Sequence, residues 1–435
     1  MNQRPRLLFL ACYFPPAITI ACVRTWNIAK YLARLGWDVT VVTPHPSLWQ
    51  HVENTEKIEE LLKQEGIQRI LTDCRWRCLV PHMKSGERGF GRIIGGMCRR
   101  IARRLDVDSG IGWVKAAERA CSTLTAQDVD LILATGSPFA AFRLAKHLSD
   151  KLGCPYVLDY RDLWTGHLHS STARSDRPST TREEARLLAD CAAVTLVSRS
   201  WGVDLDNWFD LGSKLHVITN GYDPEDLTNI ESHSFGHFAI VYTGGFYPPK
   251  RVISPLMTVL QHLKGTMNGA GHEWYFHYYG IFEDHVREAA TRYGVMDRVV
   301  LHGRVPRTEA LSAVQAANIM VVITSVVEED TLADRGMVTG KVFEALGLGT
   351  PVLLVAPSSS DARAVVADTE SGGSFTGSDI DGMASFLMDV MDGRDASPIV
   401  PEVYAWTKIA KKLDWVLREA MKTGSKDEPG IRSLK

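Results

Sequence analysis

A lysine and a glutamate lie near the start of an expected helix in GMVTGKVFEALGLGTPVLLV, residues 336–355. A helix N-terminus presents unpaired N–H groups and a partial positive charge, which suit a phosphate. The carboxylate of Glu344 can accept hydrogen bonds from both hydroxyls of a ribose. The alternative is an exposed Lys–Glu pair that contributes only about 0.3 kcal/mol. The apolar strand that follows favours a helix pointed into a binding site. The residues expected around the phosphates are Met337, Val338, Thr339, Gly340 and Lys341.

A glycine pair and two cations follow another expected strand in VYTGGFYPPKR. Gly244 and Gly245 let the backbone approach a ligand closely. Lys250 and Arg251 supply positive charge, which stabilises a leaving group that becomes more negative in the transition state. We therefore expect both cations to contact phosphate and to take part in catalysis, with an ordinary basic loop as the alternative.

Polar residues also follow expected strands in the N-terminal half. Thr19 and Arg24 lie in YFPPAITIACVR, where Arg24 either binds a phosphate of donor or acceptor or is a solvated helix residue. Arg161 and Asp162 end the strand of VLDYRDLW. Because arginine stays protonated and cannot act as a base, we expect Asp162 to orient an acceptor hydroxyl or to hold Arg161.

Less specific signals surround these positions. His167 and His169 are either alternative bases or solvated loop residues. Asn220 opens NGYDPED, whose composition predicts a turn, with positive φ at Asn-Gly and a stop at Pro224. GFGRIIGG follows no strand and does not predict a dinucleotide site.

Two metal signals are weak. The candidate ligands Cys74, Cys78 and His82 lack a fourth ligand at a zinc-site spacing. Asp-x-Asp pairs occur at 106–108, 128–130 and 204–206, which chance explains in a chain with 51 acidic residues. We expect no metal.

Strand and helix patterns alternate along the chain. Near-continuous apolar strands separated by amphipathic helices indicate parallel sheets covered on both faces. The pattern lapses at EDLTNIESHSFGH and restarts at FAIVYTGG. We expect domains at 1–223 and 224–405, a helix at 406–423 that returns to the first domain, and a flexible tail at 424–435. Since such sheets bind ligands at the carboxyl ends of their strands, the expected site is a cleft between the domains.

Composition limits the location and the partners. The chain has 435 residues, 49 Lys and Arg, 51 Asp and Glu, and a net charge of −2. A core rarely exceeds ~250–300 residues, so two domains are expected, and the charge balance argues against a nucleic-acid binder. The eight cysteines show no framework spacing, which favours reduced thiols in the cytoplasm. The apolar run near the N-terminus meets two prolines and predicts a strand rather than a signal peptide, and no run reaches the ~18 apolar residues of a membrane span.

Five motifs occur in the order typical of glycosyltransferase family 4, which the chain resembles over nearly its whole length. They are YFPP, VLDYRDLW, HVITNGYD, VVLHGRVPRTEALSAVQAANIMVVITS and GKVFEALGLGTPVLLV. The resemblance implies an α/β GT-B fold, two Rossmann-like doubly wound parallel-sheet domains that face each other across a cleft. It implies retaining transfer of a hexosyl or N-acetylhexosaminyl group from a nucleotide-sugar, without metal or cofactor. The first domain would bind the acceptor and the second the donor, with Glu344 on the ribose and Asn220 beside the donor.

Two departures from the family pattern leave alternatives open. Gly336 stands where many relatives have an acidic residue, so an acid of the preceding loop is expected to replace it. Arg161 stands where many have histidine. A non-catalytic nucleotide-sugar-binding protein therefore remains an alternative, and a sugar-nucleotide 2-epimerase of similar two-domain build is another. The acids of the loop are Glu328, Glu329, Asp330 and Asp334.

A basic amphipathic stretch, Arg88–Leu105, has no acidic residue. Apolar and basic residues on separate sides of a helix suit the surface of an anionic membrane. We expect a peripheral protein on the inner face of the cytoplasmic membrane that acts on a lipid-linked glycan of polysaccharide or lipopolysaccharide assembly. The alternative is a helix packed on its own domain. The apolar residues are Phe90, Ile93, Ile94, Met97, Ile101 and Leu105, and the basic ones are Arg88, Arg92, Arg99, Arg100, Arg103 and Arg104.

Overall fold

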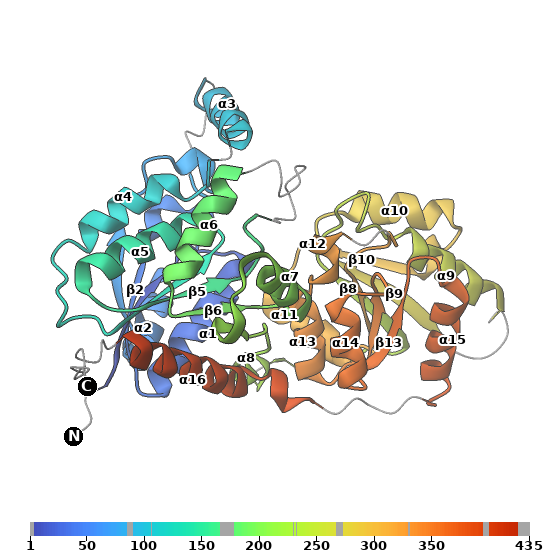
Figure 1. The fold of residues 1–435 in the computed structure, drawn as a ribbon. Helices are drawn as coiled ribbons and strands as arrows, with labels where there is room; N and C mark the ends of the chain where they lie inside the picture. Colours follow the sequence, from blue (N-terminus) through green and yellow to red (C-terminus); the bar gives the residue numbers. More distant parts are fainter. Residues whose placement is uncertain are drawn as a thin grey trace. The chain divides into compact units, whose positions relative to one another are not determined.

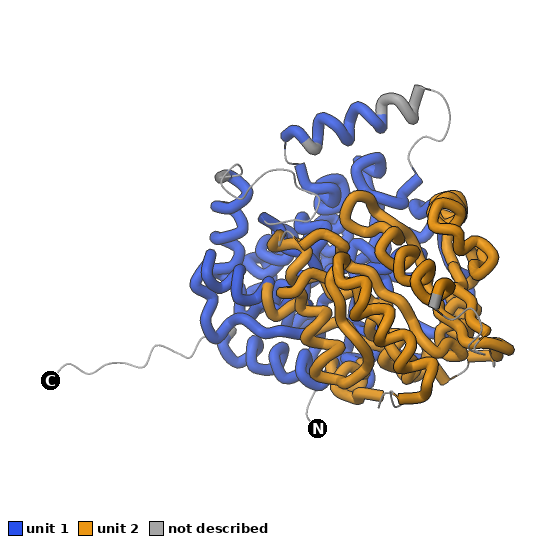
Figure 2. Tube along the Cα trace, turned by 90° about the vertical axis from the view of Figure 1, so that its right-hand side faces the viewer, with its two compact units in different colours: residues 1–197, 201–218, 410–435 blue, residues 198–200, 219–409 orange. Residues whose placement is uncertain are grey.

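The computed structural model describes residues 4–84, 90–105, 107–165, 178–228, 230–231, 233–266, 273–328, 331–394 and 400–424. The chain divides into two compact units (Figure 2). Unit 1 contains residues 1–197, 201–218 and 410–435, and unit 2 contains residues 198–200 and 219–409. Each unit is built on one parallel sheet, so the predicted α/β class with two doubly wound sheets is confirmed.

Unit 1 has a seven-stranded sheet in the order β3-β2-β1-β4-β5-β6-β7. Its interior strands are apolar on both sides because helices cover both faces, and every residue of β4 is buried. The strands are β1 Arg6–Leu10, β2 Asp38–Pro44, β3 Gln68–Thr72, β4 Leu131–Gly136, β5 Tyr156–Tyr160, β6 Ala193–Leu196 and β7 Leu215–Val217. The helices that belong wholly or largely to unit 1 are α1 Ile20–Arg34, α2 Thr55–Glu65, α3 Phe90–Arg104, α4 Ile111–Ala120, α5 Ala140–Leu152, α6 Pro178–Asp190, α7 Arg199–Phe209 and α16 Trp406–Gly424 (Figure 1).

Unit 2 has a six-stranded sheet in the order β10-β9-β8-β11-β12-β13. One buried cluster lies on each face of this sheet. The strands are β8 Phe238–Thr243, β9 Trp274–Tyr279, β10 Val299–Gly303, β11 Ile319–Ile323, β12 Val352–Val355 and β13 Gly372–Phe375. The helices are α8 Pro224–Thr228, α9 Ser254–Thr266, α10 Glu283–Arg292, α11 Arg307–Ala316, α12 Leu332–Arg335, α13 Gly340–Leu348, α14 Asp361–Asp368 and α15 Ile380–Met391.

Strand order reverses at the first strand of each sheet. In unit 1, β1 pairs with both β2 and β4. In unit 2, β8 pairs with both β9 and β11. Ligands of doubly wound sheets bind at this reversal, beyond the carboxyl ends of the strands. The loops that follow β1, β4, β8 and β11 are therefore the places to look for a site within each unit.

The chain passes between the units at positions that differ from the prediction. The division falls after Ile218 and after Ile409, not after residues 223 and 405. The predicted turn at Asn220 is absent, because Tyr222 forms a bridge with Ala405 and Gly221 has no positive φ. Gly221 instead permits close packing, since a Cβ there would lie 2.1 Å from the carbonyl oxygen of Tyr404. Pro224 begins α8 rather than stopping the chain.

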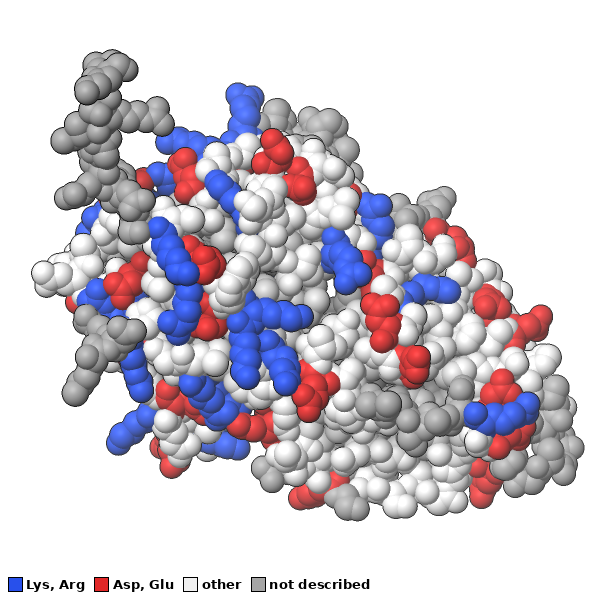
Figure 3. All heavy atoms as spheres, turned by 60° about the horizontal axis from the view of Figure 1, so that its bottom comes forward, with Lys and Arg blue, Asp and Glu red and all other residues white. Residues whose placement is uncertain are grey.

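No helix in the described part of the chain is both long and apolar enough to cross a membrane. Lysine and arginine side chains lie among aspartate and glutamate side chains on the face shown in Figure 3. The basic residues therefore form no continuous single-sign surface on the described part of that face.

Candidate functional site

Lys341 lies against the glycine turn at the strand reversal of unit 2. It is the second residue of α13. A Cβ on Gly244 would lie 2.3 Å from Nζ and 2.8 Å from Cε of Lys341. Gly244 also has a φ of 107°, which L side chains rarely adopt. Sequence reasoning expected Gly244 and Lys341 at one phosphate site, and the structure brings them into contact.

The ammonium group of Lys341 has no carboxylate within hydrogen-bonding or ion-pairing distance among the described residues. Its Nζ lies 5.1 Å from the centroid of the Tyr242 ring. Burial and, to a smaller extent, the nearby Arg251 lower the pKa of Lys341 to about 8, while the more distant Glu344 acts in the opposite direction. A desolvated cation without a contacting acid is unfavourable. An anion bound at this point would relieve the cost.

Two further polar groups at the N-terminus of α13 lack partners within the described part of unit 2. They are the buried Oγ1 of Thr339 and the buried Nε of Arg251. Thr339 is the N-cap residue, but its side chain does not cap the helix. Arg251 places Nη2 3.2 Å from Sδ of Met337. Hydrogen-bond donors and positive charge therefore converge at the helix N-terminus.

Lys250 is compensated, unlike Lys341. Its Nζ lies 2.5 Å from Oδ2 of Asp334 and 3.1 Å from Oγ1 of Thr331. The Asp334 side chain is only 2% exposed. Lys250 therefore joins the loop after β8 to α12. Because its charge is already paired with Asp334, Lys250 is not the free cation for a phosphate that the sequence predicted. Asp334 is likewise engaged and does not present a free carboxylate in place of the acid missing at Gly336.

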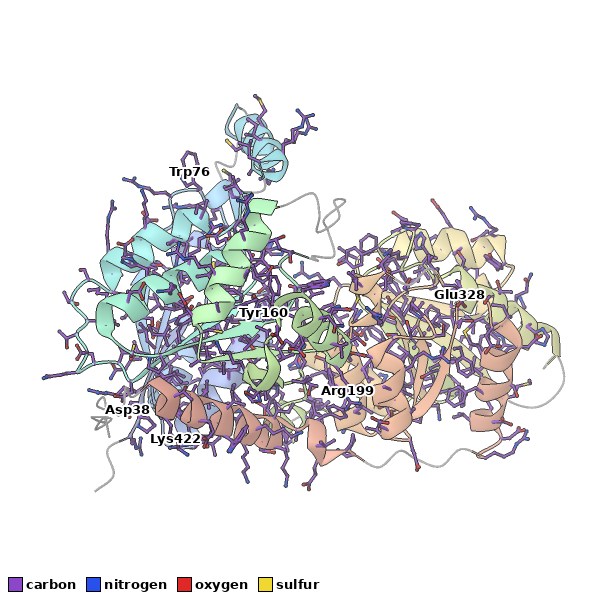
Figure 4. All side chains as sticks on the ribbon, in the orientation of Figure 1. Asp38, Trp76, Tyr160, Arg199, Glu328 and Lys422 are labelled. Atoms are coloured by element: carbon purple, nitrogen blue, oxygen red, sulfur yellow. The ribbon has the colours of Figure 1, made fainter. Side chains whose placement is uncertain are left out.

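Of the other candidates for that acid, the structure describes only Glu328. Glu328, which is labelled in Figure 4, accepts a hydrogen bond of 3.4 Å from Ser378. Glu329 and Asp330 lie outside the described residues. Gly245 follows Gly244 and packs closely, since a Cβ there would lie 2.9 Å from the Phe282 ring.

Glu344 is held by an arginine that sequence reasoning missed. Its Oε1 lies 3.0 Å from Nη2 of Arg307, whose Nη1 lies 3.0 Å from Asp226. The expected alternative, a Lys341–Glu344 surface pair, is therefore absent. The Oε2 of Glu344 has no hydrogen bond within the described residues and remains available to a ligand. Arg307 begins α11, and nothing in its sequence neighbourhood distinguishes it from a solvated helix residue.

Arg24 is a structural residue, contrary to the prediction of a phosphate contact. Its guanidinium donates to Asp159 through Nε at 3.1 Å and Nη2 at 2.6 Å, and to the carbonyl oxygen of Ile218 at 3.0 Å. Thr135 and Thr195 each donate to Asp159 at 2.8 Å. Burial alone would raise the pKa of Asp159, but Arg24 and the hydroxyl groups together lower it. The network ties α1 to β4, β5 and β6.

Arg161 lies at the strand reversal of unit 1. Its guanidinium donates to the carbonyl oxygens of Gly136 at 3.4 Å and of Ser137, and it lies 5.8 Å from the Tyr13 ring centroid. Asp162 has no hydrogen bond or ion pair within the described residues. Thr19 lies just before α1, with its Oγ1 3.2 Å from Sγ of Cys22.

His167 and His169 lie outside the described residues. No group of three or more metal-ligating side chains suits a metal ion within the described residues, which leaves Cys74, Cys78 and His82 without a site. Asn220 belongs to unit 2.

α3 has an exposed apolar side. It lies at the top of unit 1 in Figure 1. Met97 is 56% exposed, Ile101 52% and Leu105 69%. These residues recur every four positions on one side of the helix. Trp76, 55% exposed, lies at the same end of unit 1 and points outward (Figure 4). This side is therefore not packed on unit 1. The start of the predicted basic stretch, at Arg88, lies outside the described residues, as does Glu87 before it.

Solved glycosyltransferases share this architecture. Sucrose-phosphate synthase from Thermosynechococcus elongatus is 13% identical, with a TM-score of 0.64 over 97% of this chain and 100% of that one. Anabaena HepE in complex with UDP is 15% identical, with a TM-score of 0.59 over 95% and 99%. The lipopolysaccharide outer core galactosyltransferase WaaB is 12% identical, with a TM-score of 0.55 over 95% and 99%. At these identities the likeness shows the fold, which is GT-B.

Comparison of the sequence alone, without the structure, gives a second finding. No curated protein matches the chain. The family model of the glycosyl transferase 4-like domain matches residues 22–221, which include nearly all of the unit 1 sheet and the Arg161 site. Residues 22–221 are therefore similar to the glycosyl transferase 4-like domain, and the chain as a whole has the GT-B fold.

Proposed function

We propose that the chain transfers a sugar from a nucleoside diphosphate sugar to an acceptor hydroxyl, and that unit 2 holds the donor. The observation that carries this proposal is Lys341, a desolvated cation with no contacting acid in the described part of the unit. It lies at the glycine turn after β8, where a doubly wound sheet binds phosphate-bearing ligands. Thr339 and Arg251 add unsatisfied buried donors beside it.

The diphosphate would sit between the glycine turn and the N-terminus of α13. During transfer the bond from the sugar's anomeric carbon to the phosphate oxygen breaks, and a bond from that carbon to the acceptor oxygen forms. The nucleoside diphosphate leaves with the bonding electrons, and fixed positive charge at Lys341 and Arg251 lowers the barrier to its departure. We propose transfer with retention of configuration and without a metal. The acceptor proton would then pass to the leaving phosphate oxygen, because Arg161 is not a base.

Glu344 would bind the ribose. Arg307 fixes one carboxylate oxygen of Glu344, so the other can accept a ribose hydroxyl. Unit 1 would bind the acceptor through the loops at its strand reversal. There Arg161 is held by backbone carbonyls and Asp162 has its carboxylate free within the described part, so Asp162 would orient the acceptor hydroxyl.

A binding screen tests the donor site. Thermal unfolding would be followed with UDP, GDP, ADP and dTDP and their common sugars, because a ligand that binds only the native state raises the melting temperature. UDP is the first choice, since HepE was solved with it. At least one nucleotide should stabilise the wild type and not Lys341→Met. Lys264→Met is a matched control, because Lys264 pairs with Asp297 elsewhere in unit 2 and should keep the response. Absence of a response to every nucleotide would contradict the proposal.

We also propose that unit 1 docks on the inner face of the cytoplasmic membrane through α3, where a lipid-linked glycan would be the acceptor. The exposed Met97, Ile101, Leu105 and Trp76 support this, because apolar area that enters the lipid boundary contributes about 25 cal/mol per Å². The basic residues Arg100 and Arg104 of α3 would add attraction to anionic headgroups, which salt screens.

Vesicle co-sedimentation tests the membrane proposal. Met97, Ile101 and Leu105 changed together to serine should leave the protein in the supernatant with vesicles that contain anionic phospholipid. Val203, 58% exposed on α7, changed to serine is the control and should bind like the wild type. Equal sedimentation of the triple variant and the wild type would refute docking through α3.

A further inference from the structure

Two thiols meet where α3 contacts the rest of unit 1. Cys78 lies in the short helix η2, Arg77–Leu79, and Cys98 lies in α3. Both are partly exposed and neither is in a disulfide. The Cys98 thiol lies close enough to Cys78 to raise the pKa of the Cys78 thiol. The contact lies outside the sites described above.

One side of α3 is built around Cys78. Gly95, Cys98 and Arg99 lie on this side, since residues three and four apart are neighbours on a helix. A Cβ on Gly95 would lie 3.5 Å from Cβ of Cys78. Nη1 of Arg99 donates to the carbonyl oxygen of Cys78 at 3.2 Å. Gly95 and Arg99 of α3 therefore hold Cys78 close to Cys98.

The other cysteines are different. All six are buried: Cys12, Cys22, Cys74, Cys121, Cys154 and Cys191. Burial raises the pKa of the nearest of these, Cys74, to about 11. Buried thiols of this kind are chemically inert. Cys78 and Cys98 are therefore the two cysteines that are both accessible and close to each other.

We propose that Cys78 and Cys98 are a redox-active pair that forms a reversible disulfide and thereby fixes α3 on η2. The oxidant is a low-molecular-weight disulfide such as glutathione disulfide. The thiolate of one cysteine attacks a sulfur of the oxidant and forms a mixed disulfide with release of one glutathione thiolate. The second cysteine then attacks the mixed disulfide and releases the other. Two protein thiols are oxidised, one disulfide is reduced to two thiols, and no other reagent is needed.

The rate of this exchange should depend on pH. Burial raises the pKa of the Cys78 thiol, as does the neighbouring Cys98, while Arg99 lowers it. Because the thiolate is the attacking species, cross-linking should become faster as pH rises from neutral to mildly alkaline.

Peptide mapping of the full-length protein tests the pair directly. The protein would be equilibrated in glutathione buffers of increasing oxidised fraction, quenched with acid, alkylated and digested with trypsin. Cleavage at arginine and lysine places Cys78 in CLVPHMK, residues 78–84, and Cys98 in IIGGMCR, residues 93–99. The expected product is these two peptides joined, two hydrogen atoms lighter than their sum, and restored to single peptides by reduction.

Three variants and a second readout complete the test. Cys78→Ser and Cys98→Ser should each abolish the cross-linked pair, and Cys121→Ala should keep it. Hydrogen exchange of the α3 amides should be slower in the oxidised wild type than in the reduced one. Full alkylation of both thiols across the series, glutathionylation of Cys78 without a cross-link, or linkage of Cys78 to Cys74 would each overturn the proposal. None of these measurements uses a nucleotide or a lipid, so the result is independent of the proposed function.

Discussion

Replacing Lys341 by methionine should stabilise the free protein while it removes nucleotide binding. Methionine keeps an unbranched stem of similar length against the Tyr242 ring and deletes the charge. The wild type carries a cation whose pKa is lowered from 10.5 to about 8. In the unfolded chain this lysine regains its ordinary pKa, so below pH 8 folding must desolvate a charged ammonium group.

The magnitude follows from the two pKa values. A lowering from 10.5 to about 8 corresponds to roughly 3 kcal/mol of lost stability near pH 7. Between these pKa values the unfolded chain binds more protons than the native state, so the stability of the wild type rises with pH. The loss should shrink to about 1.5 kcal/mol near pH 9.5 by the same linkage. The Lys341→Met variant lacks this titrating group, so its free energy of unfolding does not show this pH dependence.

The assay is urea unfolding of wild type and Lys341→Met at several pH values from 7 to 9.5. The quantity compared is the difference between the two free energies of unfolding, so other groups that titrate cancel. Since the units need not unfold together, the difference applies to the transition of unit 2. Near pH 7 the variant should be more stable by a few kcal/mol at most, and the gap should narrow by roughly half at pH 9.5.

Either of two results would refute this reasoning. A variant less stable than the wild type near pH 7 would mean that Lys341 makes a favourable interaction in the free protein. A gap that does not change with pH would mean that packing, and not desolvation of charge, explains it. Saturating nucleoside diphosphate should reverse the order, because it stabilises only the protein that binds it.

Four further outcomes are expected. Gly244→Ala should weaken nucleotide binding at least about tenfold, because the new Cβ displaces Lys341 and strains the backbone; titration calorimetry measures this, and unchanged affinity would contradict it. Arg24→Ala should destabilise unit 1 by about 3–5 kcal/mol, since Asp159 is left buried and unpaired, without altering nucleotide affinity; a loss below 1 kcal/mol in denaturant unfolding would contradict the structural role. Glu344→Gln should reduce discrimination against deoxyribose nucleotides. A variant that discriminates like the wild type would show that Glu344 does not bind the ribose. Transfer should survive EDTA, and a loss that added metal restores would revive a metal-dependent mechanism.

Local patterns were sufficient to predict the framework. Runs such as LILATG and TPVLLV, separated by amphipathic helices, indicated parallel sheets, because only strands covered on both faces are apolar throughout. The positions of Gly244 and Lys341 could be predicted as well. Gly244 directly follows the apolar run that forms β8, and Lys341 lies in the helix that precedes the apolar run of β12. Their contact follows from the strand order, which places the loop after β8 at the reversal.

Pairings between distant segments could not be predicted. Arg24 and Asp159 are 135 residues apart, and nothing local to Arg24 distinguishes a buried ion pair from a solvated helix residue. Lys250 was expected to be a free cation because its partner Asp334 lies 84 residues away. The Asn-Gly step at residue 220 has turn composition, but packing against Tyr404 decides its conformation. Exposure of α3 was also open, because an amphipathic pattern does not say whether the apolar side meets protein or lipid.

The most direct test of the central claim is transfer of labelled sugar. The protein would be incubated with radiolabelled nucleotide-sugars and a bacterial lipid extract that supplies lipid-linked glycans, and both the labelled lipid fraction and the released nucleoside diphosphate would be measured. The account predicts that at least one donor labels the lipid fraction with equal release of nucleoside diphosphate, and that Lys341→Met abolishes both. Conversion of a donor to its 2-epimer without transfer, or binding of a nucleotide-sugar with no transfer to any acceptor, would contradict it.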